Sequence, residues 1–429
     1  MGKVFFEEMS FKPIHLRVGI GGIGGQFNDG FILGIVGITI ALASASLGLN
    51  TWWLGAIGAA SLAGLFFGSL LTGPLADKVG RRLIYQLTMP IFCLISILQF
   101  FVSSPTELFI LRLLLGLLLG ADYVVGISLV NEITPARFRG RLLSGMMVGW
   151  VGGYAIAYFV GYLLAGMGED SWRWILLSSA FPSLVVSILR LGTPSSPLWL
   201  MRQGKVEQAK EIVRKYFGEG IELKQNHTTL NGSYWELFSP RWRKNTAVGA
   251  VFYMCQVIPY FAISTFIPIM LESLSVENPY TGGMVYNFFL LIGSILGLWI
   301  IDKISRRSFL IGSFYILAVT LLVLGIWVGM PPFLVIVLFS FFSFVIAGAG
   351  VLEFAYTPEL FPTALRASGV GFVVAASRMS AALGTFFLPI ITEEFSASAA
   401  LYVCVGALLF GGIFCQIYAP ETHFKGVKK

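Results

Sequence analysis

Charged residues are scarce in this chain. Asp, Glu, Lys and Arg make up 12% of its 429 residues, against roughly 25% in soluble globular proteins, so they cannot cover a water-facing surface of this size. Cysteine and histidine are also rare, with four and three copies. The cysteines are dispersed through apolar runs and the histidines lie in polar segments, which excludes a disulfide framework and a histidine metal site inside a membrane. A soluble enzyme and a disordered scaffold are excluded, and we expect no cofactor and no metal.

Apolar residues are abundant instead. They account for 56% of the chain, and the mean hydropathy is +0.81. Because roughly 20 apolar residues cross a bilayer as a helix, this content suffices for about a dozen crossings. The sequence predicts an all-α integral membrane protein with twelve transmembrane helices, near residues 18–47, 53–74, 83–103, 108–131, 142–166, 173–191, 246–271, 282–300, 308–329, 332–357, 367–390 and 397–418.

The positive charges predict the orientation of these helices. Lys and Arg concentrate in the cytoplasmic segments of membrane proteins. With the N-terminus inside, the inside segments contain all 29 basic residues except Arg112, Arg173, Arg190 and Arg378. The outside loops contain acidic residues and no lysine. The sequence therefore predicts a multi-pass protein of the cell membrane with both termini in the cytoplasm. The net charge of +7 reflects this topology, and we expect no nucleic-acid partner.

One long polar segment divides the apolar runs six and six. It defines three predicted parts: an N-terminal six-helix bundle over 1–192, a cytoplasmic linker over 193–244 and a C-terminal six-helix bundle over 245–429. Within the linker, a Ser-Pro pair at 196–197 is a helix-start signal, and apolar residues recur at helical spacing over 206–217. This pattern predicts an amphipathic helix against the inner leaflet or under the bundle.

The two halves are related by an internal repeat. Residues 77–82 (Asp-Lys-Val-Gly-Arg-Arg) follow the second predicted helix, and residues 302–307 (Asp-Lys-Ile-Ser-Arg-Arg) follow the eighth, an offset of 225 residues. A glutamate followed seven residues later by an arginine recurs at an offset of 227: Glu132 with Arg139, and Glu359 with Arg366. Both charged motifs recur in the same order and with almost the same separation. This indicates two pseudo-symmetric six-helix bundles, an arrangement common in transporters.

These motifs resemble those of one transporter superfamily. Residues 73–82 (GPLADKVGRR) resemble the loop motif between the second and third helices of the major facilitator superfamily. Residues 194–200 (PSSPLWL), 358–363 (PELFPT) and 420–422 (PET) resemble boxes of its sugar-porter and organic-ion branches. The likeness covers nearly the whole chain, and the overall pattern is similar to bacterial metabolite transporters of this group. It implies a fold with one central cavity that opens to each side of the membrane in turn.

Other motifs point to different branches of the superfamily. Gly-Ala-Asp-Tyr at 120–123 resembles a motif of phosphate:proton symporters, and Ser377-Arg378 resembles one of organic-ion transporters. In the first helix, Asp29 matches the first aspartate of an Asp-Gly-Tyr-Asp motif, whereas Ile32 replaces the second. The resemblance therefore implies a superfamily and leaves the substrate open.

Five charged residues inside predicted helices carry the functional hypotheses: Asp29, Arg112, Asp122, Glu353 and Arg378. A charge at mid-bilayer costs roughly 2.5–3.5 kcal/mol or more, so such residues have a partner or a function. The resemblance places Arg112 beside the first helix, and we expect Asp29 and Arg112 to form the proton-coupling pair. An adjacent arginine favours the ionised carboxylate, whereas desolvation without one favours the protonated acid. Alternating access would switch Asp29 between these conditions. A static structural ion pair is the alternative.

Seven residues are predicted to bind the substrate. Asp122 lies ten residues after Arg112 and so on about the same face of its helix, and Glu353 lies in a segment that faces the cavity in relatives. For both, helix packing is the alternative. Arg378 predicts an anionic group on the substrate, because arginine binds carboxylates and phosphates with two hydrogen bonds; a pair with Glu353 is the alternative. The other predicted cavity residues are Tyr123, Gln256, Tyr260 and Asn287.

The repeated loop charges predict a cytoplasmic gate. The resemblance implies that they form salt links which stabilise the inward-closed state and break when substrate is released to the inside. Solvated charge is the alternative. The predicted gate residues are Asp77, Arg81, Arg82, Glu132 and Arg139 in the first half and Asp302, Arg306, Arg307, Glu359 and Arg366 in the second.

These features predict a secondary active transporter and not an enzyme, since the sequence shows no nucleophile–base or metal cluster. The expected function is proton-coupled symport of a small polar metabolite, an organic acid or a sugar, by alternating access. A facilitative uniporter or a drug-efflux antiporter on the same fold is the alternative. A receptor on this fold is disfavoured because only nine residues follow Pro420. The expected partners are the substrate, protons and the lipid bilayer, and we expect a functional monomer.

Overall fold

Twelve membrane-spanning helices make up most of the protein. The computed structural model describes residues 4–223, 234–301, 303–327, 329–362 and 365–422, and twelve of its helices are long and apolar enough to cross a bilayer. The prediction of a twelve-helix membrane protein is therefore confirmed.

The bounds of the elements follow the predicted spans closely. The first six spans are α1 (Pro13–Leu47), α2 (Thr51–Val79), α3 (Arg81–Phe100), α4 (Pro105–Ile133), α5 (Ala136–Leu164) and the broken pair α6 (Ser171–Ser178) and α7 (Ala180–Arg190). The last six are α10 (Arg243–Thr265) continued by α11 (Ile267–Ser273), α12 (Pro279–Ile300), α13 (Arg306–Ile326), α14 (Pro332–Glu359), α15 (Arg366–Glu394) and α16 (Ala397–Tyr418). The short elements are β1 (Val4–Phe5), η1 (Phe6–Glu8), η2 (Ala165–Met167), α8 (Pro197–Arg202), α9 (Val206–Ile212), η3 (Val213–Phe217), β2 (Ile221–Glu222) and η4 (Tyr234–Phe238).

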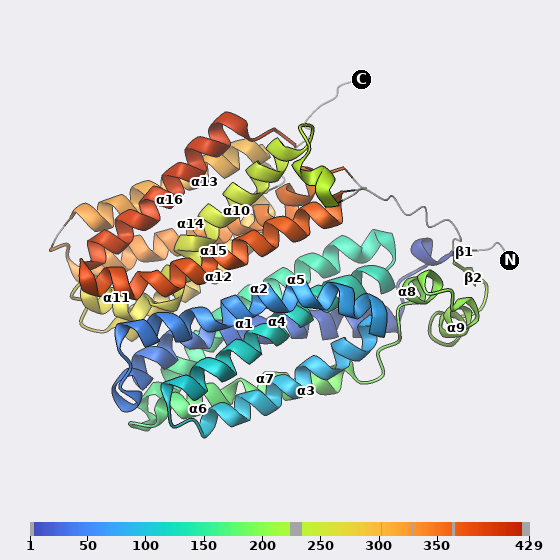
Figure 1. The fold of residues 1–429 in the computed structure, drawn as a ribbon, viewed down its shortest axis with the longest axis horizontal. Coiled ribbons are helices and arrows are strands. Elements are labelled where there is room, and N and C mark those ends of the chain that lie inside the picture. The colour runs from blue at the N-terminus through green and yellow to red at the C-terminus, as the bar shows by residue number, and fades with distance from the viewer. Residues whose placement is uncertain (1–3, 224–233, 302, 328, 363–364, 423–429) are drawn as a thin grey trace.

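The spans form two groups of six that lie side by side, the first in blue to green and the second in yellow to red (Figure 1). In the first group α1 packs on α5, α2 on α4, and α3 on the pair α6 and α7. The second group repeats this scheme, with α10 on α15, α12 on α14 and α13 on α16. Each pairing recurs six spans later, so the packing has the pseudo-symmetry that the sequence repeat predicts.

Glycines allow the paired helices to approach closely. A Cβ on Gly64 or Gly68 of α2 would overlap backbone carbonyl oxygens of α4, and one on Gly293 of α12 would overlap the carbonyl oxygen of Phe344 on α14. Small residues serve this purpose in membrane helices because lipid provides no hydrophobic drive for association, so contact depends on close packing. The same pair of helices in each half is joined in this way.

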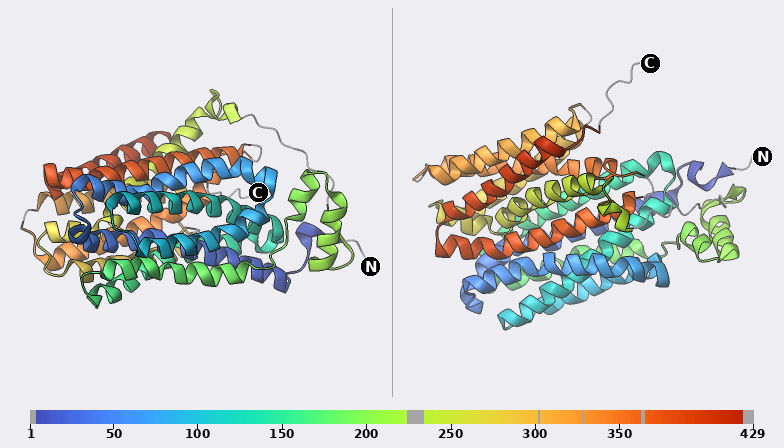
Figure 2. Two further views of the ribbon diagram at one scale, coloured as in Figure 1. Left: turned by 60° about the horizontal axis from the view of Figure 1, so that its bottom comes forward. Right: turned by 45° about the horizontal axis from the view of Figure 1, so that its top comes forward.

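The segment between the halves lies beyond one end of the bundle, beside the N-terminal strand (Figures 1 and 2). We name this end, marked by α8 and α9, the linker side, and the opposite end, where α1 ends and α2 begins, the far side. Helix α8 starts at the predicted signal, because the Ser196 hydroxyl accepts a hydrogen bond from the Trp199 amide at 3.1 Å. The predicted amphipathic helix is α9 followed by the π-helical turn η3, which ends at Gly218 with a φ of 101°.

The N-terminal segment pairs and packs with this linker and so holds it against the first half. Strand β1 pairs in parallel with β2, and Phe6 and Met9 pack in one apolar cluster with Val213 and Phe217. The same cluster includes Val130 of α4. The linker helices are therefore packed against the first six-helix group.

Candidate functional site: a central cavity between the halves

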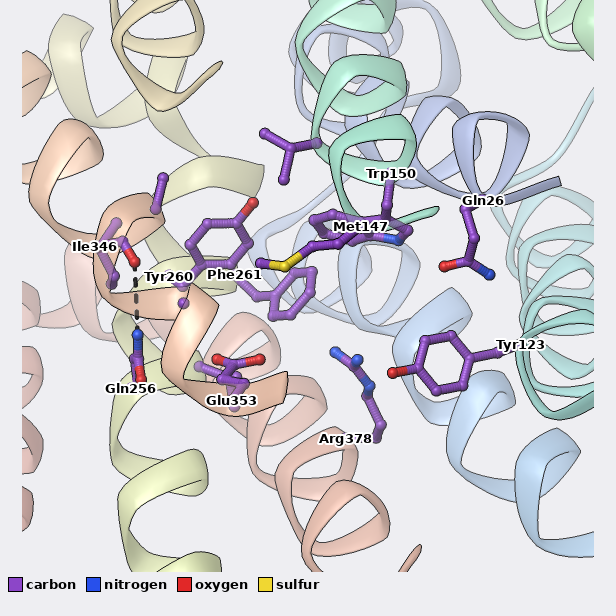
Figure 3. A pocket seen from close by; sticks show the side chains of 14 residues that line it. Gln26, Tyr123, Met147, Trp150, Gln256, Tyr260, Phe261, Ile346, Glu353 and Arg378 are labelled. Atoms are coloured by element: carbon purple, nitrogen blue, oxygen red, sulfur yellow. Dashed lines mark hydrogen bonds between the residues drawn. The ribbon is translucent and has the colours of Figure 1, made fainter. Parts of the chain in front are cut away.

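A cavity lies between the two halves, with about 620 Å³ of empty space that includes its opening to solvent. Helices α1, α4 and α5 line it from the first half, and α10, α14 and α15 line it from the second (Figure 3). Five of the seven predicted substrate residues lie in its wall: Tyr123, Gln256, Tyr260, Glu353 and Arg378.

Arg378 reaches from α15 to the opposite half across the cavity. Its guanidinium carbon lies 5.9 Å from the ring centre of Tyr123 on α4 and 5.8 Å from that of Phe261 on α10. The residue is buried, its Nε has no hydrogen-bond partner, and within the described residues it forms no salt bridge. The direct pair with Glu353 that we considered as an alternative is therefore not formed. Aromatic rings and a hydrogen bond with the side chain of Tyr123 hold this desolvated arginine. Since no carboxylate within the described residues pairs with it, it is available to a ligand.

Glu353 and Gln256 supply polar groups on the opposite wall. Glu353 on α14 interacts with the side chain of Tyr253 and, electrostatically, with Arg378. Gln256 on α10 donates to the carbonyl oxygen of Ile346 at 3.5 Å (Figure 3). The cavity thus offers one cation, one carboxyl group and carboxamides, spaced around its rim.

Aromatic side chains close the cavity toward the far side. Trp150 stacks on Tyr154 along α5 with ring centres 5.6 Å apart. Tyr260 lies 6.4 Å from Trp150, and Phe261 lies 6.2 Å from it. Flat apolar surfaces of this kind suit a substrate with a flat or apolar body.

The predicted pair of Asp29 with Arg112 is not formed in this structure. Asp29 is buried, accepts a hydrogen bond from Gln26 Nε2 at 3.3 Å and leaves Oδ1 without a partner. Arg112 is also buried and donates through Nη2 to the carbonyl oxygen of Ile32 at 2.8 Å. Ile32 lies almost one helical turn beyond Asp29. In this conformation Arg112 therefore contacts α1 almost one turn away from the Asp29 carboxylate.

Asp122 does not line the cavity, contrary to the prediction. It is fully buried within the first half, where both its oxygens bind the guanidinium of Arg190 from α7, one of them at 2.9 Å. Thr88 also donates to it, at 2.7 Å. The ring of Tyr85 lies 3.8 Å from the guanidinium carbon of Arg190. Asp122 therefore has the local helix-packing partner of the alternative in this conformation, and its role in substrate binding stays a prediction.

Asn287 is also absent from the central cavity. It lies on α12 in a separate groove between α5 and α12, and its amide donates to the carbonyl oxygen of Gly283 at 2.9 Å. The groove is lined by apolar side chains, among them Phe159 and Phe288. Asn287 therefore lies away from the residues around Arg378 in this conformation, and its role in substrate binding stays a prediction.

The predicted gate charges gather at the linker side within their own halves. Glu132 at the end of α4 pairs with Arg81 at the start of α3 and, at 3.4 Å, with Arg202 of α8. Arg306 at the start of α13 pairs with Glu359 at the end of α14, at 3.7 Å. The repeat thus places an equivalent salt bridge in each half.

The other predicted gate residues bind mostly backbone. Arg139 donates to the carbonyl oxygen of Thr134, Arg307 to that of Gln416 and Arg366 to that of Pro358. Arg82 is exposed. The side chain of Asp77 and the whole of Asp302 lie outside the part of the chain that the structure describes, so their predicted contacts stay predictions.

The two halves meet tightly at the far side. Tyr158 of α5 donates to the carbonyl oxygen of Tyr280 on α12 at 3.5 Å. A Cβ on Gly37 of α1 would overlap the carbonyl oxygen of Thr265, and one on Gly55 of α2 would overlap that of Phe386. The two halves are therefore packed backbone against backbone at the far side, beyond the cavity.

Replacing Gly55 by valine should open the far side. A side chain cannot displace the Phe386 carbonyl without separating α2 from α15, and overpacking costs about 1–3 kcal/mol. The penalty applies only to the form in which the halves are in contact at the far side. It therefore shifts the equilibrium between the closed and open forms of the far side toward the open form, by roughly 5- to 150-fold. Spin labels at Ser103 and Ser273, exposed on the far side of each half, should show a population with longer distances.

Gly166 provides the matched control for this substitution. It also lies at the far side, but a Cβ there meets nothing within 4 Å. Gly166→Val should leave the distance distribution as in the wild type. Identical distributions for both valine variants would show that the contact at Gly55 does not hold the far side closed.

Several residues in and near this site were not predicted from the sequence, among them Trp150, Gln26 and Arg190. Trp150 and Gln26 line the cavity, but nothing in the sequence distinguishes them from other aromatic and amide residues in apolar helices. Arg190 is different, because it lies inside the predicted sixth helix and Asp122 needed a partner. The rule that buried charges are paired was sufficient to nominate it.

The fold and the cavity define a transporter, and comparison with known proteins identifies its family. Residues 31–429 match the family described as "Sugar (and other) transporter", and the chain belongs to this family of the major facilitator superfamily. Two Escherichia coli proteins are each 36% identical to it: "Inner membrane metabolite transport protein YgcS", over 98% of this chain and 94% of that protein, and "Putative metabolite transport protein YaaU", over 97% and 95%. The partially occluded inward-open structure of the xylose transporter XylE from E. coli shares the fold, with a TM-score of 0.80, 20% identity and coverage of 97% and 100%.

Proposed function

We propose that this transporter is a proton-coupled symporter of a small organic acid. The observation that carries the proposal is Arg378, a buried cation in the central cavity that forms no salt bridge in the described chain. Arginine binds a carboxylate with two parallel hydrogen bonds. Because leaving a buried charge without a partner is costly, a carboxylate substrate gains both attraction and relief of that cost.

The rest of the cavity suits a compact acid with a flat body. Trp150, Tyr260 and Phe261 offer aromatic faces, and Gln256 and Glu353 accept or donate hydrogen bonds at the opposite wall. A hydroxyl or ring nitrogen on the same molecule would bind there. A sugar is the second candidate, since these carboxamide and carboxyl groups also bind hydroxyls. One structure that shares the fold is that of the "proton:xylose symporter XylE".

Asp29 is proposed as the site that carries the proton. Its Oδ1 has no hydrogen-bond partner, so hydrogen bonds stabilise the ionised form of this buried carboxyl group only in part, and a proton can bind to it. Arg112 donates to the carbonyl oxygen of Ile32, which lies almost one helical turn from Asp29, so reorientation of the long Arg112 side chain along α1 would bring the guanidinium toward Asp29. We propose that the inward-facing and outward-facing states differ in this contact between Arg112 and Asp29. Arg112 then has a role in releasing the proton.

The proposed transport cycle uses the two ends of the molecule in turn. The glycine contacts pack the halves together at the far side in this conformation, while the charged clusters around Glu132 and Glu359 lie at the linker side. We assign the linker side to the cytoplasm, as the lysine and arginine distribution predicts, and the clusters to its gate. The cavity is built from one chain, with six-helix parts on either side of the linker, which supports a functional monomer.

Uptake into proteoliposomes under an imposed pH gradient tests this proposal. Wild-type protein should accumulate benzoate or another aromatic monocarboxylate, and a protonophore should abolish the accumulation. Equilibration without accumulation would identify a uniporter. Preferential transport of D-xylose or D-glucose over every carboxylate in the panel would identify a sugar transporter and contradict the role assigned to Arg378.

A further inference from the structure

One side chain connects the substrate cavity to the proposed proton site. Gln26 of α1 lines the cavity, and its Nε2 donates to Asp29 Oδ2 at 3.3 Å. Figure 3 shows the Gln26 amide with its oxygen toward the cavity side chains and its nitrogen turned away from them. Asp29 itself does not belong to the cavity wall. A ligand in the cavity therefore contacts Gln26 and not the carboxylate.

The charges around Asp29 are otherwise fixed. From α4 and α7 it interacts electrostatically with Asp122 and Arg190, which bind each other at two points. Tyr123 on α4 is a further titratable group that interacts with Asp29 among the described residues, and it lies against Arg378. A change in the charge of Asp29 therefore acts first on its hydrogen-bond partner, Gln26.

Helix α1 itself cannot adjust easily at this level. A Cβ on Gly25 would overlap Arg190, and one on Gly30 would overlap the carbonyl oxygen of Trp150 on α5. The backbone around Gln26 is thus fitted closely to its neighbours on two sides. Rotation of the Gln26 amide about its last side-chain bond is the low-cost movement, because its environment on the cavity side is open.

A carboxamide presents opposite groups at its two ends, a carbonyl acceptor and an NH₂ donor. When Asp29 is ionised it accepts from the NH₂ group, and the carbonyl oxygen faces the cavity. When Asp29 takes up its proton on Oδ2, the oxygen that faces Gln26, the new O–H donates to the amide carbonyl oxygen, which requires the amide to turn by half a rotation. The NH₂ group then faces the cavity as a donor.

We infer that Gln26 is the positioning residue that couples proton binding at Asp29 to substrate binding, by turning its donor end toward a substrate carboxylate only when Asp29 is protonated. This inference rests on the proposed symport of an organic acid. An ionised Asp29 presents the Gln26 oxygen, which repels a carboxylate. By reciprocity, a bound carboxylate favours the protonated state of Asp29. Proton and substrate then bind together, as symport requires.

Calorimetric binding of benzoate to purified protein, in two buffers of different ionisation enthalpy, tests the inference. The wild type should take up protons as benzoate binds. Gln26→Leu removes both ends of the amide, and Gln26→Asn shortens the side chain so that it cannot reach Asp29 and the cavity together. In both variants the number of protons taken up per benzoate should fall, and the gain in affinity on acidification, expected at roughly 5- to 150-fold in the wild type, should largely disappear.

Gln256→Leu is the matched control, because Gln256 lines the same cavity from α10 and bonds to Ile346 instead of a carboxylate. It should weaken benzoate binding without changing the proton uptake per benzoate. Wild-type proton uptake that persists unchanged in both folded Gln26 variants would overturn the inference and leave symport standing. A wild type that binds benzoate without proton uptake, or binds no carboxylate, would overturn the proposed function and the inference together.

Discussion

Substitution of Arg378 by glutamine should weaken carboxylate binding by roughly 10- to 100-fold, equivalent to the ~1.5–3 kcal/mol of a hydrogen bond to a charged group. The guanidinium is the cation of the cavity wall, and a neutral carboxamide cannot replace its charge or its paired donors. Arg378→Lys keeps the charge but loses the two-point geometry, so its affinity should lie between those of the wild type and Arg378→Gln. Equilibrium calorimetry with benzoate measures the effect.

D-Xylose serves as the uncharged control ligand in the same experiment. If Arg378 acts by binding a carboxylate, any weak binding of the sugar should change far less than that of benzoate. Equal losses for both ligands would indicate that Arg378 maintains the shape of the cavity through Tyr123 and Phe261. Benzoate binding that is unaffected in Arg378→Gln would contradict the assignment of the substrate as an anion.

Removal of either member of the Asp122–Arg190 pair should cause the largest loss of stability in the protein, about 3–5 kcal/mol for each single substitution. Both side chains are 1% exposed, so Arg190→Leu leaves an unpaired carboxylate and Asp122→Asn leaves an unpaired guanidinium in the membrane interior. The double substitution should cost clearly less than the two singles together, because it leaves no isolated charge. Unfolding in mixed detergent micelles measures these differences.

An exposed salt bridge at the linker side is the control for the substitutions of Asp122 and Arg190. Arg202 pairs with Glu132 at 3.4 Å, but its side chain is 49% exposed and Glu132 also pairs with Arg81. Arg202→Leu should therefore cost less than about 1 kcal/mol. A cost for Arg190→Leu as small as that for Arg202→Leu, or strict additivity in the double variant, would show that the buried pair is not needed for stability.

The fold was predictable because its signals are long and repeated. These signals are the twelve apolar runs, the excess of Lys and Arg in the segments predicted to face the cytoplasm, and the charged motif that occurs in both halves. None of them depends on the exact placement of a single residue. The site was predictable where a residue type is out of place in a membrane. Arg378 and Glu353 fall in the cavity because a charge in an apolar helix needs a polar surrounding.

The pairing of the charges could not be read in the same way. The sequence gives the helix that carries Asp122 and its approximate face, but a rotation by one residue turns a side chain by 100°. A rotation of this size decides whether a side chain lines the central cavity or lies buried within its own six-helix half. Asp122 faces Arg190 because the assembled bundle brings α4 within side-chain reach of α7, and Gly25 of α1 leaves room for the Arg190 side chain. Contacts of this kind between helices distant in sequence depend on the assembled packing.

Solute-induced proton uptake, followed with an external pH electrode in proteoliposomes, tests proton-coupled symport most directly. Wild-type protein should alkalinise the medium when benzoate is added. Asp29→Asn, which cannot exchange a proton, should exchange benzoate across the membrane without moving protons. Benzoate transport with no proton movement in the wild type, or with equal proton movement in wild type and Asp29→Asn, would contradict symport through Asp29.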